Sequence, residues 1–369
     1  MLVEEPPTAT VDIEPGYAGS TEEEQPGGSA TFLIATPLQA LNAIEARHHF
    51  KLAADQCPLV WFHSASEAND RQTQDMLGRA DWARIHTISH SGGSFRSWKR
   101  RFDEVNVAAR SMEHTDYLFV GDYAFDLMRH FAHAADCRKV VVLDDGNSTL
   151  LIDRSRRDPA VPYHFMPHSF GQRVKHLIKT RVCGMNRSLF DELAFFTVYE
   201  LDGDHRTSIV PNTYQHLRGR LRLTSRSDET FFLGDALPDK NLMSEDAYFG
   251  YLERALGHLN QSSVIYMAHR LEKAAKLGKI ESRFGISVRE STMPIECRLS
   301  LAPSIPKLIA GFVTSALDSC RILCGDQTGI KSFYIDPADC ATTVRDSVEE
   351  LYGHYESYTS GNFELIRVF

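Results

Sequence analysis

The chain has 369 residues, of which 43% are apolar and 24% are charged. This composition excludes collagen-like, coiled-coil and wholly disordered chains. The length suits two domains, each large enough to bury its own core. No run of about 18 apolar residues is present, so we expect no membrane-spanning helix.

The formal net charge of −9 is concentrated at one end of the chain. Residues 1–30 contain seven acids and no Lys or Arg, and without them the charge is only −2. Such a balance gives no basis for nucleic-acid binding, so we expect none. The segment 1–30 has little apolar content, which predicts a disordered acidic tail. It also lacks the basic and apolar regions of a secretory signal.

The seven cysteines suggest a reducing compartment. Their number is odd and their spacing matches no metal-binding framework, so we expect free thiols and no bound metal. Without a secretory signal, this pattern predicts a cytoplasmic protein.

From Thr31 onward, short apolar runs alternate with amphipathic stretches. The first set predicts strands at 31–36, 58–62, 84–88, 117–121 and 139–143. Helices are predicted between them, at 37–53, 69–79, 96–112 and 123–134. Continuous β-branched strands separated by helices are typical of a parallel sheet covered on both faces.

A second alternation follows the less regular segment 147–228, in which we expect a helix near 170–182 and a strand near 194–200. The new set predicts strands at 229–234, 262–267, 286–290, 308–313 and 331–335. It also predicts helices at 244–260, 270–281, 314–323 and 342–357. We therefore expect two facing, Rossmann-like, doubly wound α/β domains with the ligand in an interdomain cleft. Their bounds are predicted at 31–225 and 226–345, with a helix and tail at 346–369 that can cross back to the first domain.

The first motif that carries chemistry is Asp144-Asp145-Gly146, which follows the most apolar predicted strand. A carboxylate at a strand end can act as a general base, and a second carboxylate beside it would raise its pKa toward a useful value. An ordinary polar turn with an Asp cap explains the same residues, so both readings stay open. Paired Asp can also bind Mg²⁺, but no third ligand stands at a suitable spacing.

Two further motifs follow predicted strands of the second half. His269 and Arg270 open an amphipathic helix, where a His can donate to an anionic oxygen. Thr314 and Ser315 precede another helix, so that hydroxyls and helix N–H groups can cradle a phosphate. A structural His and a plain helix cap account for these residues too, and neither alternative is excluded.

Four single residues are weaker candidates for ligand contact. Glu296 can accept hydrogen bonds from a ribose, as acids do in dinucleotide-binding folds. Gly234 can allow close approach of a ligand. Thr36 and Gln39 begin a helix after the first strand and can touch a substrate, although packing alone explains them equally well.

Residues 154–187 form a basic segment with eight Lys or Arg and a single acid. It is either a solvated basic face or a surface for an anionic glycan or anionic lipid head groups. We expect at most a peripheral membrane contact there. Its aromatic content is too low for a platform that stacks single-stranded nucleic acid.

Taken together, the motifs resemble those of the bacterial sialyltransferases of the lipooligosaccharide and capsular polysialyltransferase type. The resemblance spans about residues 31–325 and is carried by short motifs: TPLQALNA at 36–43, Asp144-Asp145-Gly146, His269-Arg270-Leu271-Glu272, Ile295-Glu296 and Thr314-Ser315. It implies a GT-B fold with an acceptor-side first domain and a nucleotide-donor second domain. It also implies a CMP-sialic acid donor that is used without a metal cofactor.

The resemblance assigns roles to individual positions. The family's Asp/Glu-Asp/Glu-Gly motif, which supplies the general base, falls on residues 144–146. Its His-Pro motif falls on His269 and its Ser/Ser-Thr motif on residues 314–315, and both bind the CMP phosphate. The expected contacts are Gly234, His269, Arg270, Glu296, Thr314 and Ser315 for the donor, and Thr36, Gln39 and Gly146 for the acceptor. Arg270 stands where the family has Pro, so legionaminic acid, pseudaminic acid or Kdo remain open as the donor sugar.

The sequence thus predicts an inverting, metal-independent glycosyltransferase. It would transfer sialic acid or a related nonulosonic acid from a CMP donor to a cell-surface glycan, such as lipid-linked lipooligosaccharide or capsule, at the inner face of the cytoplasmic membrane. One of the two Asp residues would deprotonate the acceptor hydroxyl, while His269 and the hydroxyls would stabilise the departing phosphate. Two alternatives remain: a GT-B enzyme that uses a UDP-sugar, as a transferase or an epimerase, and a non-catalytic two-lobe sugar-binding protein.

Overall fold

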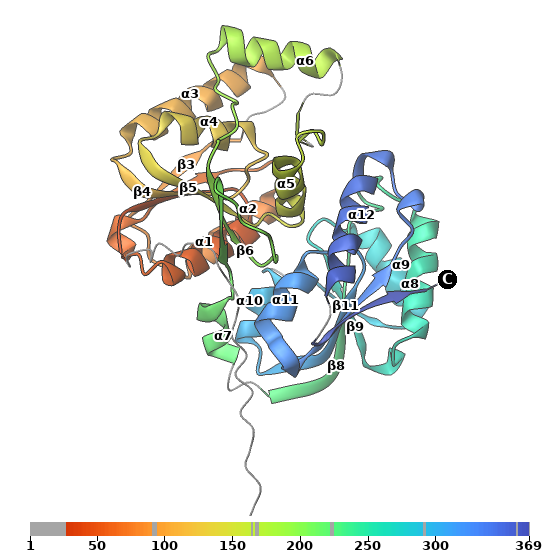
Figure 1. Ribbon diagram of the computed structural model, residues 1–369. Helices are drawn as coiled ribbons and strands as arrows, with labels where there is room; N and C mark the ends of the chain where they lie inside the picture. The colour runs from red at the N-terminus through yellow and green to blue at the C-terminus, as the bar shows by residue number, and fades with distance from the viewer. Residues whose placement is uncertain are drawn as a thin grey trace, which may run out of the picture.

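The computed structural model describes residues 27–90, 94–163, 165–166, 170–221, 225–290, 293–358 and 361–368. The chain forms two domains, each built on one parallel sheet (Figure 1). The order of the first sheet is β3 (Arg84–Ile88), β2 (Pro58–Phe62), β1 (Ala30–Ile34), β4 (Thr115–Val120), β5 (Cys137–Leu143), β6 (Leu193–Thr197) and β7 (Thr207–Pro211). All its neighbouring strands are parallel. The reversal of strand order at β1 and β4 is the doubly wound pattern.

The helices of the first domain cover both faces of this sheet because its strands are apolar on both faces. Along β1, Phe32 and Ile34 pack into one core and Leu33 packs into the other. The helices are α1 (Pro37–His49), α2 (Glu67–Leu77), α3 (Phe95–Ser111), α4 (Asp126–Ala134), α5 (Ser148–Arg157), α6 (Phe170–Leu177) and α7 (Gln215–Leu221). A short π-helical segment, η2 (Ile178–Val182), continues α6. In Figure 1, α3, α4 and α6 lie on the side of the sheet away from α1.

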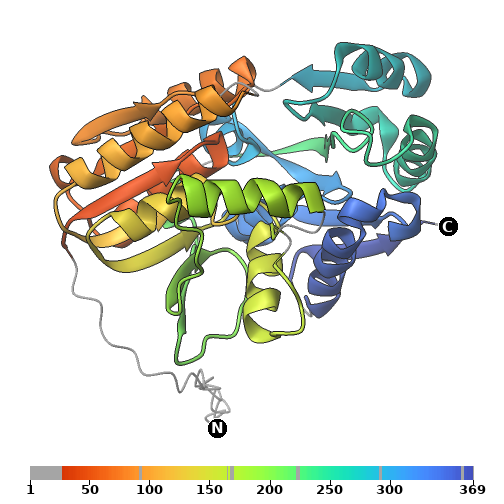
Figure 2. The same ribbon diagram turned by 90° about the horizontal axis from the view of Figure 1, so that it is seen from above.

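The second domain repeats the same plan, as Figure 2 shows from above. Its sheet runs β10 (Ser287–Glu290), β9 (Val264–Ala268), β8 (Ser225–Leu233), β11 (Ser304–Gly311), β12 (Gly329–Tyr334) and β13 (Phe363–Arg367). Its helices are α8 (Glu245–Gly257), α9 (Ala274–Phe284), α10 (Ile295–Leu301), α11 (Ala316–Cys324) and α12 (Thr342–Ser357). All its strands are also parallel, so both domains are Rossmann-like and together have the GT-B arrangement.

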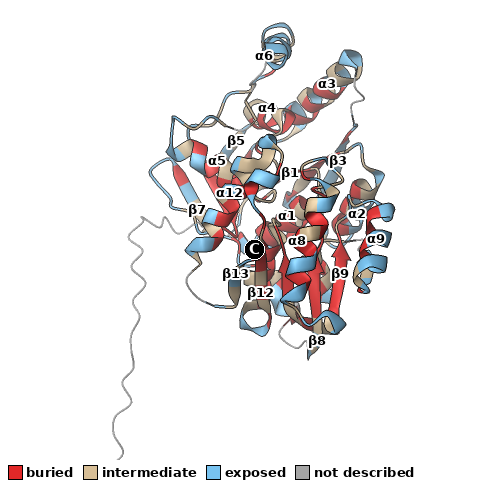
Figure 3. Cartoon of the chain, turned by 90° about the vertical axis from the view of Figure 1, so that its right-hand side faces the viewer, coloured by how far each residue is buried: buried red, intermediate tan, exposed pale blue. Residues whose placement is uncertain are grey.

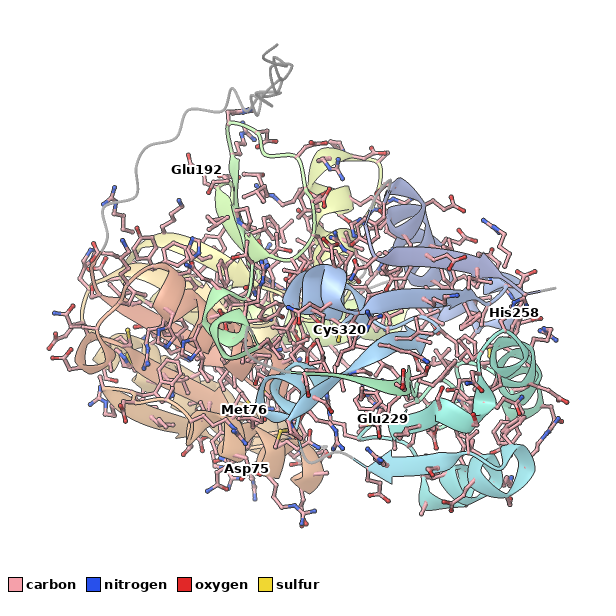
Figure 4. The ribbon with its side chains drawn as sticks, turned by 90° about the horizontal axis from the view of Figure 1, so that it is seen from below. Asp75, Met76, Glu192, Glu229, His258 and Cys320 are labelled. Carbon is pink, nitrogen blue, oxygen red and sulfur yellow. The ribbon has the colours of Figure 1, made fainter. Side chains whose placement is uncertain are left out.

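The two domains share a buried apolar contact, and Figure 3 shows that the strands in the interior of the molecule are largely buried. The Sδ atom of Met76 on α2 lies 3.4 Å from Sγ of Cys297 on α10. Met76 and Cys320 lie where the domains meet, whereas Glu192 and His258 lie toward opposite ends of the molecule (Figure 4). A hollow of about 410 Å³ between the domains is lined mainly by α5 and α12.

Several elements differ from the sequence expectations. The pattern missed α5, α7, α10, β7 and β13, and β8 begins at Ser225, before the strand that we predicted at 229–234. The last residues form a strand that pairs with β12, and were wrongly expected to be only a helix and tail. The helix α12 contacts α5, because Asn147 donates to Ser347 (2.6 Å) and Arg154 pairs with Glu350 (2.8 Å).

The remaining expectations concern the tail, the cysteines and the membrane. Residues 1–26 of the predicted acidic tail lie outside the described residues. None of the seven cysteines, all of which lie in the described part of the chain, forms a disulfide, and five of them are buried. Among the described residues, no helix is both long and apolar enough to cross a bilayer.

Candidate functional site

Three carboxylates lie at the carboxyl ends of β4 and β5, which are neighbours in the first sheet. Asp144 and Asp145 directly follow β5, and Asp122 follows β4 after a single glycine. Parallel strands bring their carboxyl ends to one edge of the sheet, so these side chains gather there. The sequence analysis missed Asp122, although its position after a strand was the signal that identified the other two.

Asp144 is buried and its carboxylate is fully occupied by its own domain. Its Oδ1 accepts from the hydroxyls of Thr149 (2.8 Å) and Thr197 (2.7 Å), and its Oδ2 accepts from the Val198 N–H (2.8 Å). Burial raises its pKa to about 6 despite these donors, and the charge of Asp318 adds to the rise. Asp144 thus joins the end of β5 to β6 and to the start of α5.

Asp145 has a different environment from Asp144. It is only half-buried, and the Gln39 side chain forms a hydrogen bond with it. Burial raises its pKa, while the bond from Gln39 and the positive charge of Arg270 lower it. For Asp122, burial and the charge of Asp145 raise the pKa to about 7. The negative charge of Asp145 therefore disfavours the ionised form of Asp122.

Gln39 is positioned to serve Asp145. Its Oε1 accepts from the Ala35 N–H (2.7 Å), so its amide NH₂ is the group that donates to Asp145. Gly121 permits this, because a Cβ there would lie 2.6 Å from the Gln39 Oε1. Thr36 caps α1 by accepting from the Gln39 N–H (3.3 Å). Direct contact of Thr36 with an acceptor stays a prediction.

The loop after β9 is held by a buried ion-pair network. The Glu272 carboxylate accepts from the His269 N–H (2.6 Å) and the Tyr266 hydroxyl (2.7 Å), and it pairs with Lys276 (2.7 Å). A Cβ on Gly234 would lie 2.3 Å from Glu272 Oε2, so glycine is required at that position. The close approach at Gly234 is thus explained by packing within the domain, and its contact with a donor stays a prediction.

His269 is neutral and its tautomer is defined by this loop. Burial, together with the charges of Arg270 and Lys240, lowers its pKa to about 3. Its Nδ1 accepts from the Leu271 N–H (3.2 Å), so the ring proton resides on Nε2. The Nε2–H is then a fixed hydrogen-bond donor, and its contact with an anionic oxygen stays a prediction.

The start of α11 supplies hydroxyls. Thr314 Oγ1 accepts from the Ala316 N–H (3.3 Å), and the Thr314 carbonyl accepts from the Tyr355 hydroxyl (3.0 Å). Ser315 stands at the N-cap position, but no side-chain cap bond is formed there. Its hydroxyl faces the first domain: a Cβ on Gly146, which has a φ of +63°, would lie 3.3 Å from Ser315 Oγ.

The structure therefore brings the principal motifs together across the domain boundary. Gly146 meets Ser315, and Arg270 is close enough to Asp145 to lower its pKa. Glu296, by contrast, has its hydrogen-bond partner within its own domain. Its carboxylate is buried and accepts from the Ser319 hydroxyl, so its contact with a ribose stays a prediction. Among the described residues, no group of three or more His, Cys, Asp or Glu is arranged to hold a metal.

Comparisons with known proteins return no family, and the solved structures that match are similar only at a low level. No family model matches the chain, and no curated protein matches it. MurG from Acinetobacter baumannii has a TM-score of 0.45 at 8% identity, with 92% of this chain and 85% of that chain covered. UDP-GlcNAc 2-epimerase from Methanocaldococcus jannaschii has a TM-score of 0.45 at 14% identity, with 92% of this chain and 89% of that chain covered. A sialyltransferase from Photobacterium damsela has a TM-score of 0.43 at 10% identity, with 92% of this chain and 81% of that chain covered. At such scores any inference about function must come from this chain's own residues.

Proposed function

We propose that the protein is an inverting glycosyltransferase that moves a nonulosonic acid, such as sialic acid, from a CMP-activated donor to a glycan hydroxyl. The observation that carries the proposal is the meeting of Gly146 with Ser315 and of Asp145 with Arg270 across the domain boundary. A carboxylate on one side and neutral or cationic donors on the other suit a reaction that removes a proton and releases a phosphate.

In this proposal Asp145 is the general base. Asp144 is a poor choice, because three donors already occupy its two oxygens. Asp145 has one amide partner and a raised pKa, which brings its basicity closer to neutral pH. It would accept the proton of the acceptor hydroxyl as that oxygen bonds to the anomeric carbon of the donor. Gln39 would hold the carboxylate in place during this step.

The second domain would stabilise the leaving group. As the bond from the anomeric carbon to the phosphate oxygen breaks, its electron pair stays on the CMP phosphate. The Nε2–H of His269, the Arg270 guanidinium and the Ser315 hydroxyl are the donors that would meet this charge. Because Glu272 and Lys276 already fix the loop, the donors need little reorganisation when charge develops. A single displacement of this kind inverts the anomeric centre and requires no metal.

The acceptor and its location extend the same proposal. A lipid-linked glycan such as lipooligosaccharide or a capsule precursor, met at the inner face of the cytoplasmic membrane, fits an enzyme whose seven cysteines form no disulfide. The basic segment 154–187 would provide peripheral contact with that membrane. Several of its charges are used internally, however: Arg154 pairs with Glu350 and Arg157 with Asp153.

The test is a nucleotide and donor panel. Thermal unfolding is measured with CMP and UDP, and products of CMP-sialic acid, CMP-legionaminic acid, CMP-pseudaminic acid and CMP-Kdo with a glycan panel are read by mass spectrometry. Protection by CMP and transfer from one CMP-sugar support the proposal. Protection by UDP alone would establish the UDP-sugar alternative, and binding without turnover on the full panel would indicate a sugar-binding protein.

A further inference from the structure

The helix formed by α6 and η2 exposes its apolar side chains, whereas a surface helix of a globular domain normally buries them. Neither segment has a buried residue. Five apolar side chains are exposed, with Phe170 at 84%, Leu177 at 56% and Val182 at 75%, and with Val174 and Ile178 accompanying them. We call these five residues the outer apolar face. Phe170, Val174 and Leu177 are spaced four and three residues apart, so they share one side of the helix.

The polar side of this helix is the side that attaches it to the domain. Nδ1 of His176 lies 2.5 Å from the Arg187 guanidinium, which pairs with Asp126 on α4 (2.6 Å). Lys179 lies 3.6 Å from Asp126 and 5.1 Å from the ring centroid of Trp98 on α3. A surface helix normally buries its apolar stripe and exposes its polar side. In this protein the contacts of His176 and Lys179 hold the polar side against the domain, so the apolar side faces outward.

Cations accompany the outer apolar face. The helix carries Arg173, Lys175, Lys179 and Arg181 and no acid. Arg173, Lys175 and Arg181 are exposed and pair with no acid of the described part of the chain. The neighbouring α3 adds an exposed Phe95 (57%), which stacks on Trp98, and the cations Arg96, Lys99 and Arg100. Figure 1 shows α6 and α3 at the same end of the first domain.

We propose that α6 and η2 dock in the surface of an anionic phospholipid bilayer. Apolar side chains would enter the boundary between head groups and acyl chains, while Arg173, Lys175 and Arg181 would contact lipid phosphates. The charge of the face favours this occupant over a second copy of the chain, because two copies would bring unpaired cations together. The membrane contact named in the proposed function thereby becomes a defined helix, and it does not depend on the donor or acceptor.

The experiment measures sedimentation of the full-length protein with lipid vesicles, without nucleotide or glycan. We expect binding to vesicles of phosphatidylcholine mixed with phosphatidylglycerol, and much weaker binding to phosphatidylcholine alone. The double variant Phe170→Ser/Leu177→Ser should weaken binding at least about ten-fold, since both exposed side chains lose their burial in lipid. Lys175→Gln and Arg181→Gln should each weaken it about five-fold.

Matched controls make the result specific. Leu301→Ser removes an exposed leucine on α10, and Arg71→Gln removes an exposed cation on α2. Both should bind as the unchanged protein does. Equal binding by the Phe170→Ser/Leu177→Ser protein, or no binding to anionic vesicles, would overturn the proposal. So would a dimer in solution that this double variant dissociates, because the face would then serve self-association. Circular dichroism and the melting temperature show that each variant is folded, and none of these readouts depends on transferase activity.

Discussion

The strand ends of the two sheets carry opposite chemistry on the same fold. In the first domain the ends of β4 and β5 present carboxylates, and burial raises the pKa of Asp122, Asp144 and Asp145. In the second domain the ends of β9 and β11 lead to a neutral imidazole, a guanidinium and hydroxyls. The same architecture thus presents carboxylates at the strand ends of one sheet and hydrogen-bond donors at those of the other.

The difference arises from what each loop is packed against. Asp144 is surrounded by hydrogen-bond donors of its own sheet and is fixed in place. His269 is fixed by a carboxylate and a lysine behind it, so that its Nε2–H is the donor that remains. Each domain therefore uses one buried acid to support the loop that carries a neighbouring polar residue. Asp144 supports Asp145, and Glu272 supports His269.

The largest expected effect separates the two adjacent aspartates. Asp145→Asn should lower kcat by about 10²- to 10⁴-fold, the contribution of a positioned general base, with little change in the affinity for CMP. The measurement is steady-state transfer from the CMP-sugar, with the melting temperature recorded in parallel. Asp228→Asn, at a fully exposed acid, is the matched control and should retain activity. Retained transfer in Asp145→Asn would remove the base assignment.

The second effect tests the proposed role of His269 in stabilising the departing phosphate. His269→Gln should lower kcat/KM for the CMP-sugar by about 10²- to 10³-fold, as for the loss of one preorganised donor. His258→Gln is the control, because His258 is exposed and lies at the far end of the second domain (Figure 4). The pKa of His269 is lowered to about 3, so its imidazole is neutral from about pH 5 to about pH 9. Substitution of His269 should therefore leave the shape of the kcat/KM profile unchanged over that range. A profile that did change would mean that His269 titrates and is not a fixed donor.

Part of the fold and part of this candidate site could be predicted from the sequence. Alternating apolar runs were sufficient for most strands, and the strand-end rule located residues 144–145, 269–270 and 314–315. The pattern did not separate Asp144 from Asp145, because the separation depends on Thr197 and Val198, more than fifty positions away. It also missed α7, a short helix whose start is capped by Glu45 from α1. Such tertiary partners leave no periodic signal in the sequence.

The third effect concerns stability rather than chemistry. Asp144→Ala should lower the free energy of unfolding by about 1–3 kcal/mol, since two hydroxyls and one N–H lose a buried acceptor. The raised pKa means that the folded chain binds this proton more tightly than the unfolded chain. Its contribution to stability therefore declines as pH rises from 3.8 to about 6, and the variant should lack that part of the pH dependence. Urea unfolding across this range measures both effects, and an unchanged midpoint would contradict the supporting role.

The smallest expected effect tests whether Asp122 and Asp145 share one site. The charge of Asp145 raises the pKa of Asp122, and such a coupling between two carboxylates is reciprocal, so Asp122→Asn should lower the pKa of Asp145. Because the base must be ionised to accept a proton, the acid limb of the kcat/KM profile should move to lower pH by about one unit. The folded structure and the CMP affinity should be preserved, since the Asp122 side chain accepts only from the backbone N–H groups of Ala124 and Phe125 among the hydrogen bonds described. A limb that stays in place while activity falls would assign Asp122 a role in substrate binding instead, and would separate it from the base.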